Sequence, residues 1–423
     1  MARKKKASGG SDEPRRRRRG EGDDVDPVGV PAGEGGRGEL PIEPTGADED
    51  LPVGFRDPLG AGLPDPLSRY GMGDDDYREP TTVLAEDPAM FHTLRKLNRD
   101  LQNASRSLGH LEIRFLCDLY YQIQKLRKGA FMQVKLSQRV QQEAEGEDGE
   151  TKVVVEPNEF ITWLFQNMQV FENNIKKSLD IVSDQSLAGR WAKSHVGVGP
   201  VLTAGYLSHF DITKAPTVGN FWSFAGLNPT MKWEKGEKRP WNGRLKVLAW
   251  LMGSVMIRFC NHPKATYGRH YIVRREREIK KNWRGDFAPL CVDKLDNFNI
   301  GKTTDAYAWY SGSYPQDQQD AYFEAVLSGT KPPTMEADKP GAGRQCLPPA
   351  RILLRAQRLP VKLFISHLHQ VMYIDHYKHE PQRPYAFTDL GHEHFIPPYN
   401  FVNGEIVIQD PADLNLPRSA SLD

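Results

Sequence analysis

Apolar residues recur at spacings of three and four through much of the chain beyond residue 80, and that period is typical of amphipathic α-helices. The first long series consists of Leu94, Leu97, Leu101, Leu108, Leu111, Phe115, Leu119 and Ile123. We expect this stretch to be helical, with Gly109 marking a kink and Gly129 marking an end, because glycine weakens a helix interior.

A second apolar series follows the acidic stretch EAEGEDGE, residues 143–150, which we interpret as a loop between helices. Its members alternate spacings of four and three, as in a coiled-coil seam: Leu164, Met168, Phe171, Ile175, Leu179 and Val182. The seam could pair with another helix of the same chain, or with the same helix of a second copy in a homo-oligomer. The sequence leaves both arrangements open.

Two closely spaced glycines then separate a polar helical run from an apolar one. The polar run ends near His195, Gly197 and Gly199 follow, and the apolar run begins at Val201. Glycine permits a sharp turn and a close approach of the backbone to another surface. Pro200 falls where a helix accepts proline, at its first position. The pattern therefore predicts a helix, a tight hairpin and a second helix.

Such a hairpin is a candidate anion site, because the first amides of the second helix lack intrahelical partners and carry partial positive charge. On a nucleic acid the anion would be a backbone phosphate. The candidate contacts here are Gly197, Val198, Gly199 and Thr203. A plain connection between two helices would show the same glycines.

The remaining chain is expected to add one apolar helix over about 244–261 and another from Ala350, the latter broken or kinked at Pro360. Residues 285–349 lose the helical period, so we interpret them as an insertion with little core of its own. The end of the chain, from Pro381, is rich in proline and aromatic residues and is expected to be extended and to wrap back on the domain.

These patterns predict a mostly α fold in which a coiled-coil helix leads into a helix-hairpin-helix core, after a long disordered tail. Glycine and proline fill 25 of the first 80 positions, which favours disorder there. The expected regions are a charged tail at 1–80, a helical region with the coiled-coil helix at 81–185, the helix-hairpin-helix core at 186–284, the insertion or linker at 285–349, a closing helix at 350–385 and an extended tail at 386–423.

Charge changes this picture most in the segment after the hairpin. Residues 231–284 hold fifteen Lys or Arg against four Glu, a local net charge of +11 in a chain whose total is +1. Such a concentration is typical of a surface that binds a polyanion. The candidate DNA contacts in its first part are Lys232, Lys235, Lys238, Arg239, Arg244 and Lys246. Two tryptophans among them, Trp233 and Trp241, could stack on exposed bases or anchor the loop in the core.

Composition excludes several other classes. The four cysteines lie far apart and form no C-x-x-C pair, which favours a reducing compartment and no zinc or disulfide framework. No opening apolar run and no stretch of about eighteen apolar residues is present, so neither a secretory signal nor a membrane span is expected. We expect an intracellular, cytoplasmic protein without a membrane partner, and a nucleoid-associated one in a bacterium or phage.

The stretch HVGVGPVLTAGYLSHF, the later FWSFAGLNP, the basic loop and the long helix after it resemble a known family. They are similar to the C-terminal domain of insertion-sequence transposases of the IS-one-ten, IS-one-sixteen and IS-nine-oh-two families. The resemblance covers about residues 160–275 and 350–385, including the coiled-coil helix that precedes this domain. It implies duplex DNA as partner and DNA transposition or recombination, within a mobile element, as the context.

The family's catalytic groups are not matched. Its N-terminal nuclease-like domain, with carboxylates that hold divalent metal, has no counterpart, because no apolar strand ending in Asp lies near the N-terminus. The family's serine follows the G-L-x-P element, but this chain has no serine between Leu227 and Gly253. Ser254 lies in an apolar helix, where a hydroxyl usually bonds its own backbone. The catalytic residues stay unknown, and magnesium is expected as a cofactor only if the chain is active.

Two further functions remain as alternatives. The chain could be an active transposase with an unrecognised nucleophile or a partner nuclease, or an RNA-binding or structural protein that keeps only the scaffold. Six of the twelve histidines lie between His367 and His394, and together with Asp375 they could coordinate a metal ion. Ordinary packing of histidines on a helix and tail is the simpler interpretation, so no metal site is assigned.

Overall fold

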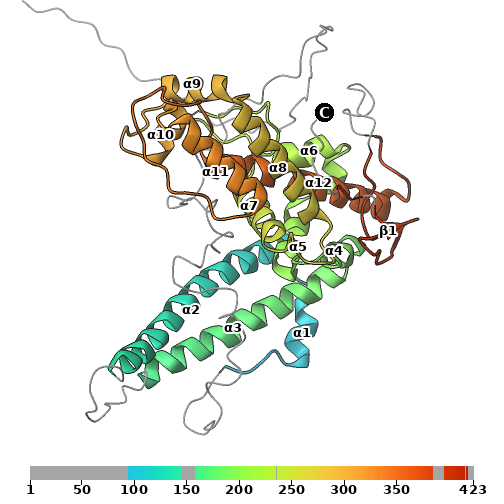
Figure 1. The fold of residues 1–423 in the computed structure, drawn as a ribbon. Coiled ribbons are helices and arrows are strands. Elements are labelled where there is room, and N and C mark those ends of the chain that lie inside the picture. The colour runs from blue at the N-terminus through green and yellow to red at the C-terminus, as the bar shows by residue number, and fades with distance from the viewer. Residues whose placement is uncertain (1–93, 145–157, 235, 384–394, 415, 418–423) are drawn as a thin grey trace, which may run out of the picture. The chain divides into compact units, whose positions relative to one another are not determined.

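The computed structural model describes residues 94–144, 158–234, 236–383, 395–414 and 416–417, all within the unit Pro44–Asp423 (Figure 1). These residues confirm the predicted mostly α fold. The predicted tail at 1–80 lies outside them. The described residues form α1 Arg99–Ser105, α2 His110–Ala144, α3 Glu159–Asp184, α4 Leu187–Lys193, α5 Pro200–His209, the 3-10 helix η3 Ile212–Lys214, α6 Val218–Phe224, α7 Gly243–Arg258, α8 Tyr267–Arg284, α9 Ala288–Asn297, α10 Asp305–Ser311, α11 Gln316–Ser328, α12 Pro349–Tyr377, and the strands β1 Phe401–Val402 and β2 Glu405–Ile406.

The two longest N-terminal helices, α2 and α3, lie side by side and antiparallel (Figure 1). Near one end, Ile113 of α2 shares a buried cluster with Leu179 of α3. Farther along, Arg127 pairs with Glu172, and the ring of Phe131 stacks on Phe165 with centroids 5.4 Å apart. The α3 seam is thus paired with α2 of the same chain, the first of the two arrangements that the sequence left open.

The predicted helix end at Gly129 is wrong, because α2 continues to Ala144. An added Cβ at Gly129 would meet nothing within 4 Å, so the residue lies on an open surface of the helix. A glycine in an exposed helix interior costs only about 1 kcal/mol relative to alanine. A helix of 35 residues packed against α3 tolerates that loss.

The main core surrounds α5, which packs against α2, α3, α4 and α7. Eight of its ten residues are buried. The fully buried side chains of Trp191, Tyr206 and Phe364 bring α4, α5 and α12 together, and the ring of Trp191 stacks on Phe364 with centroids 5.4 Å apart. We predicted that the helix is broken or kinked at Pro360; it is not broken, because α12 continues through this proline.

An ion triad fixes α8 to α12. The carboxylate of Glu278 is 1% exposed and accepts from Arg274 at 2.5 Å and from Arg355 of α12 at 2.8 Å. On the same helix, Glu276 pairs with Lys280 at 2.6 Å in a more exposed position. The two carboxylates therefore differ in burial although they are separated by one residue.

The prediction that residues 285–349 have little core is wrong. Helices α9, α10 and α11 build a second core around Trp309, Phe323 and Cys291. This second core includes Ile279 from the end of α8 and Ile352 from the start of α12. α10 has only 7 residues, which is shorter than the window of about 11 residues over which a helical period can be recognised.

Residues 395–414 and 416–417 pack on the main core, which contains Tyr399, Phe401 and Leu416. Trp191 Nε1 donates to the carbonyl of Tyr399 at 2.8 Å, and His367 Nε2 donates to the carbonyl of Ile396 at 2.9 Å. The short antiparallel pair β1–β2 lies within residues 395–414. No helix of the described ranges has both the length and the apolar content that a membrane crossing requires.

Candidate nucleic-acid interface

The residues between α4 and α5 form the tight turn that the two glycines predict. Gly197 has a φ of +83°, and an added Cβ would lie 2.6 Å from both Val255 Cγ1 and Phe259 Cδ2 at the end of α7. Position 197 therefore favours glycine for two reasons: its backbone is left-handed, and α7 lies too close to leave room for a Cβ. Gly199 is the N-cap of α5 with a φ of −91°, and its Cβ position is open.

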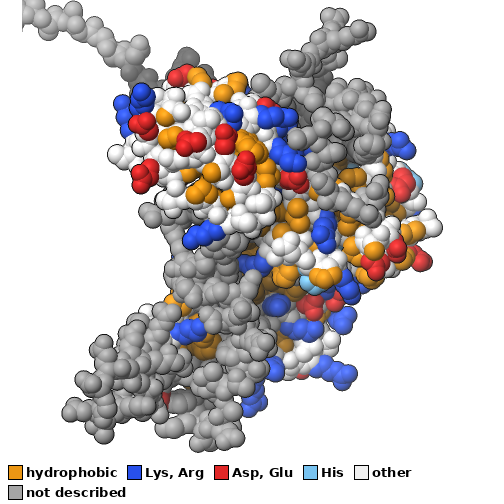
Figure 2. All heavy atoms as spheres, in the orientation of Figure 1, with side chains coloured by type: hydrophobic (Ala, Val, Ile, Leu, Met, Phe, Trp, Pro, Cys, Tyr) orange, Lys and Arg blue, Asp and Glu red, His pale blue; other side chains and the backbone are white. Residues whose placement is uncertain are grey.

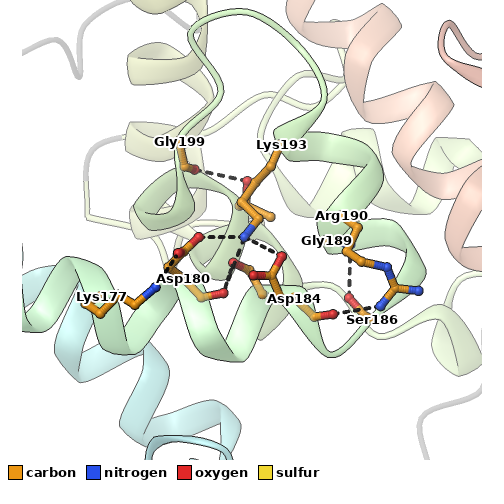
Figure 3. A network of polar contacts seen from close by, with 10 residues as sticks. Lys177, Asp180, Asp184, Ser186, Gly189, Arg190, Lys193 and Gly199 are labelled. Carbon is orange, nitrogen blue, oxygen red and sulfur yellow. Dashed lines mark hydrogen bonds and ion pairs between the residues drawn. The ribbon is translucent and has the colours of Figure 1, made fainter. Parts of the chain in front are cut away.

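A polar network holds α4, and with it the start of this turn, against the end of α3 (Figure 3). Lys193 Nζ lies 2.6 Å from Asp180 Oδ1 and 2.6 Å from Asp184 Oδ1. The Ser186 hydroxyl caps α4 by accepting from the amide of Gly189 at 3.0 Å. Partial burial acts to raise the pKa of Asp180, but the hydrogen bonds and charges of Lys193 and Lys177 together outweigh it and lower this pKa.

The residue before the turn, His195, belongs to the core. Its ring meets Trp191 and Tyr267 edge to face, with centroids 4.9 and 5.0 Å apart. Burial lowers the pKa of His195 to about 3, so its imidazole is neutral at pH 7. The turn is therefore anchored by an uncharged aromatic contact at its start and by α7 at Gly197.

Two of the four candidate contacts in the turn cannot reach a ligand with their side chains. Val198 is 6% exposed and Thr203 is 1% exposed. The hydroxyl of Thr203 donates to the carbonyl of Gly199 at 3.0 Å, within α5. The half-buried backbone at Gly197 and Gly199 is what this turn offers to a ligand.

The basic loop before α7 presents Lys232, Lys238 and Arg239 to solvent, while Lys235 lies outside the described residues. The loop is closed on itself, because Trp233 Nε1 donates to the carbonyl of Glu237 at 2.8 Å. The guanidinium of Arg239 lies over the Trp233 ring, 4.8 Å from its centroid. Arg239 is thereby held on the outer surface of the loop.

The second tryptophan, Trp241, is a core anchor. It is 8% exposed, and Lys246 Nζ lies 4.4 Å from the centroid of its ring. An added Cβ at Gly226 would lie 2.9 Å from Trp241 Cγ, so the chain passes directly against this ring. Arg244, exposed at the start of α7, is paired with Asp118 of α2. Trp241 is thus closed to bases, whereas the cations around it remain near the surface.

Helix α7 connects the loop and the turn. The basic loop enters α7 at Gly243, and the turn contacts α7 at Val255 and Phe259, so the two lie at opposite ends. The 16 residues of α7 span about 24 Å. The candidate contacts predicted from the sequence therefore form two separate groups and not one cluster.

The structure adds two exposed cations near the turn, Arg258 at the end of α7 and Lys264 just before α8. Our choice of candidate residues omitted both, although the chain has no acidic residue between Glu237 and Glu276. That acid-free stretch was the signal that could have identified them. The insertion differs, since residues 285–349 hold nine acidic and five basic side chains, and Figure 2 shows both signs side by side over α9, α10 and α11.

The serine and two of the histidines considered from the sequence bond to the protein backbone. Ser254 donates to the carbonyl of Trp250 at 3.1 Å, which confirms the expected bond to its own helix. His367 and His369 are buried, and their Nε2 atoms lie 2.9 Å from backbone carbonyls. No group of three potential metal ligands occurs in the described ranges, and His392 and His394 lie outside them.

Comparison of the chain with protein-family models, curated proteins and solved structures found no match.

Proposed function

We propose that this chain binds duplex DNA along α7, gripping the sugar-phosphate backbone with the glycine turn at one end and the basic loop at the other. The proposal takes its context, DNA transposition or recombination, from the resemblance of residues 195–229 to insertion-sequence transposases. It assigns the chain no catalytic site of its own.

The observation that carries the proposal is the distribution of charge along α7. The chain between Glu237 and Glu276 contains nine Lys or Arg and no Asp or Glu. Exposed cations lie at both ends of this helix: Lys232, Lys238, Arg239 and Arg244 at its start, and Arg258 and Lys264 at its end. A surface with such an excess of positive charge attracts a polyanion, and its acidic side chains, Glu234, Glu237 and Asp118, lie only at the loop end of α7.

The separation of the two groups fits a duplex. A length of about 24 Å corresponds to about 7 base pairs, because one turn of about 10 base pairs rises about 34 Å. Two groups of cations so spaced can contact phosphates of one duplex at two positions. Phosphate contacts carry no sequence information directly, so the proposed binding has little sequence preference.

A salt titration of DNA binding tests the proposal. Five exposed cations along α7, not counting Arg244 because Asp118 pairs with it, predict a slope of about −4.5 when log affinity is plotted against log salt, at about −0.9 per phosphate. The variants Lys238→Ala and Lys264→Ala remove one cation at each end, and each should reduce the magnitude of the slope by about 1. Lys331→Ala, an exposed cation of the insertion, is the matched control and should leave the slope unchanged.

Three results would contradict the proposal. If neither Lys238→Ala nor Lys264→Ala changes the slope, α7 is not part of the DNA interface. A preference for single-stranded or folded RNA over duplex DNA, measured by competition on the same sample, would favour the RNA-binding alternative. Nicking or strand transfer by the purified chain with magnesium would show that a catalytic site is present.

A further inference from the structure

Helix α2 has an apolar face that no described element covers. Its inner face packs on α3 through buried residues such as Ile113 and Cys117. On the opposite face Leu111 is 76% exposed, Phe115 is 63% exposed and Leu126 is 55% exposed. A helix that is apolar on two faces normally has a partner on each.

The exposed positions of this face are spaced symmetrically over residues 111–126, although Gly129 and Gln133 extend the exposed face beyond that range. Between residues 111 and 126 they are Leu111, Glu112, Phe115, Gln122, Lys125 and Leu126. Reading the positions backwards gives the same spacing, centred between Asp118 and Leu119. A two-fold axis makes a surface its own partner, so each apolar residue of the face must meet a suitable residue of the same face in the second copy.

We propose that two copies of the chain pair through this face, with their α2 helices antiparallel about a two-fold axis near Asp118 and Leu119. In that register Leu111 lies opposite Leu126 of the second copy, and Phe115 lies at the level of Gln122 of the second copy. The proposed face adjoins the α7 surface at the ion pair of Asp118 with Arg244, but the proposal does not depend on the proposed DNA binding.

Charge selects the antiparallel orientation. The face is acidic at Glu112 and basic at Lys125, so antiparallel pairing places opposite charges at the same level at each end. Parallel pairing would align like charges, which opposes association. Near the axis, Asp118 would lie close to Asp118 of the second copy, but each carboxylate is already paired with Arg244 of its own chain. The chain's own charges thus favour one orientation of its second copy.

The mass of the full chain in solution, measured by sedimentation at several concentrations, is the first test. The chain should dimerise, and Phe115→Glu should weaken dimerisation at least about 30-fold, because it places a charge at the centre of the buried face. Phe160→Glu is the matched control, since Phe160 is 62% exposed at the start of α3, away from this face. A monomer at every concentration, or equal weakening by both variants, would overturn the proposal.

Cross-linking tests the register without relying on a disruptive variant. The four native cysteines are buried free thiols, so they give little background with a short thiol-specific cross-linker. A mixture of Leu111→Cys and Leu126→Cys chains should form a cross-linked dimer, whereas Leu111→Cys alone should not, because two copies of residue 111 would lie about 22 Å apart along the helices. Cross-linking of Leu111→Cys to itself, or failure of the mixture to cross-link, would overturn the antiparallel arrangement.

Discussion

The two glycines of the turn should respond very differently to alanine. Gly197→Ala places a side chain where φ is +83° and where two atoms of α7 lie 2.6 Å away. The left-handed backbone costs about 1 kcal/mol for alanine, and the crowding adds about 1 to 3 kcal/mol. We expect Gly197→Ala to lower the free energy of unfolding by about 2 to 4 kcal/mol.

Gly199→Ala should be close to neutral for stability. Its φ of −91° suits alanine, and nothing lies within 4 Å of the added Cβ. The lower entropy of the unfolded chain favours alanine by about 0.4 to 1 kcal/mol, and the poorer N-cap opposes it by a similar amount. A larger residue at position 199 should therefore block a phosphate from the turn without unfolding the protein. Gly199→Leu should weaken DNA binding while the fold is kept.

Urea unfolding measures both effects, since a change in midpoint at constant m-value reports stability alone. The double variant Gly197→Ala with Phe259→Ala provides a stricter check, because removing the Phe259 ring relieves part of the crowding. The two substitutions should couple by at least about 1 kcal/mol. Equal stability of Gly197→Ala and Gly199→Ala, or additive effects in the double variant, would refute the contact between the turn and α7.

Two further predictions concern the core. Glu278→Gln leaves both arginine partners without a carboxylate and should lower the free energy of unfolding by about 2 to 3 kcal/mol, less than for a fully buried pair because the arginines are partly exposed. Glu276→Gln should change it by less than about 0.5 kcal/mol, and a similar loss in both variants would contradict the role of the triad. Burial lowers the pKa of His195 and of His367 to about 3, so the unfolded state binds more protons between that pH and about 6.5. Stability should therefore fall as the pH drops below 6.5, by up to about 1.4 kcal/mol per pH unit for each histidine. Urea midpoints measured from pH 7 to pH 4.5 check this slope, which should decrease in a His367→Gln variant.

Periodicity in the sequence predicts faces better than it predicts their partners. The seam through Ile175 and Leu179 identifies the buried side of α3, but only the structure shows that α2 covers it, through Ile113 and Cys117. The seam at Leu164–Val182 left open a partner within the chain or in a homo-oligomer, whereas the face now unpaired among the described elements is on α2. Local spacing contains no information about which of two apolar faces meets which neighbour.

The sequence predicted which segments form the candidate interface, but it did not predict how those segments lie relative to one another. The glycine turn and the basic loop are local features, and both occur where the sequence places them. Their separation along α7 depends on tertiary packing of Gly197 against Val255 and Phe259, and no motif encodes that contact. The burial of Val198 and Thr203 has the same origin, because α5 is surrounded by four helices and has little free surface.

The second core has a consequence for shortened forms of the chain. Residues 285–349 look dispensable as a lateral addition, yet Ile279 and Ile352, which precede and follow them, are buried by the same aromatic cluster. Excising the addition would leave the free ends of α8 and α12 with uncovered apolar surface, next to the ion triad that fixes these helices together. A truncated chain that joins α8 directly to α12 would need other apolar side chains to bury Ile279 and Ile352 before it could adopt the same fold.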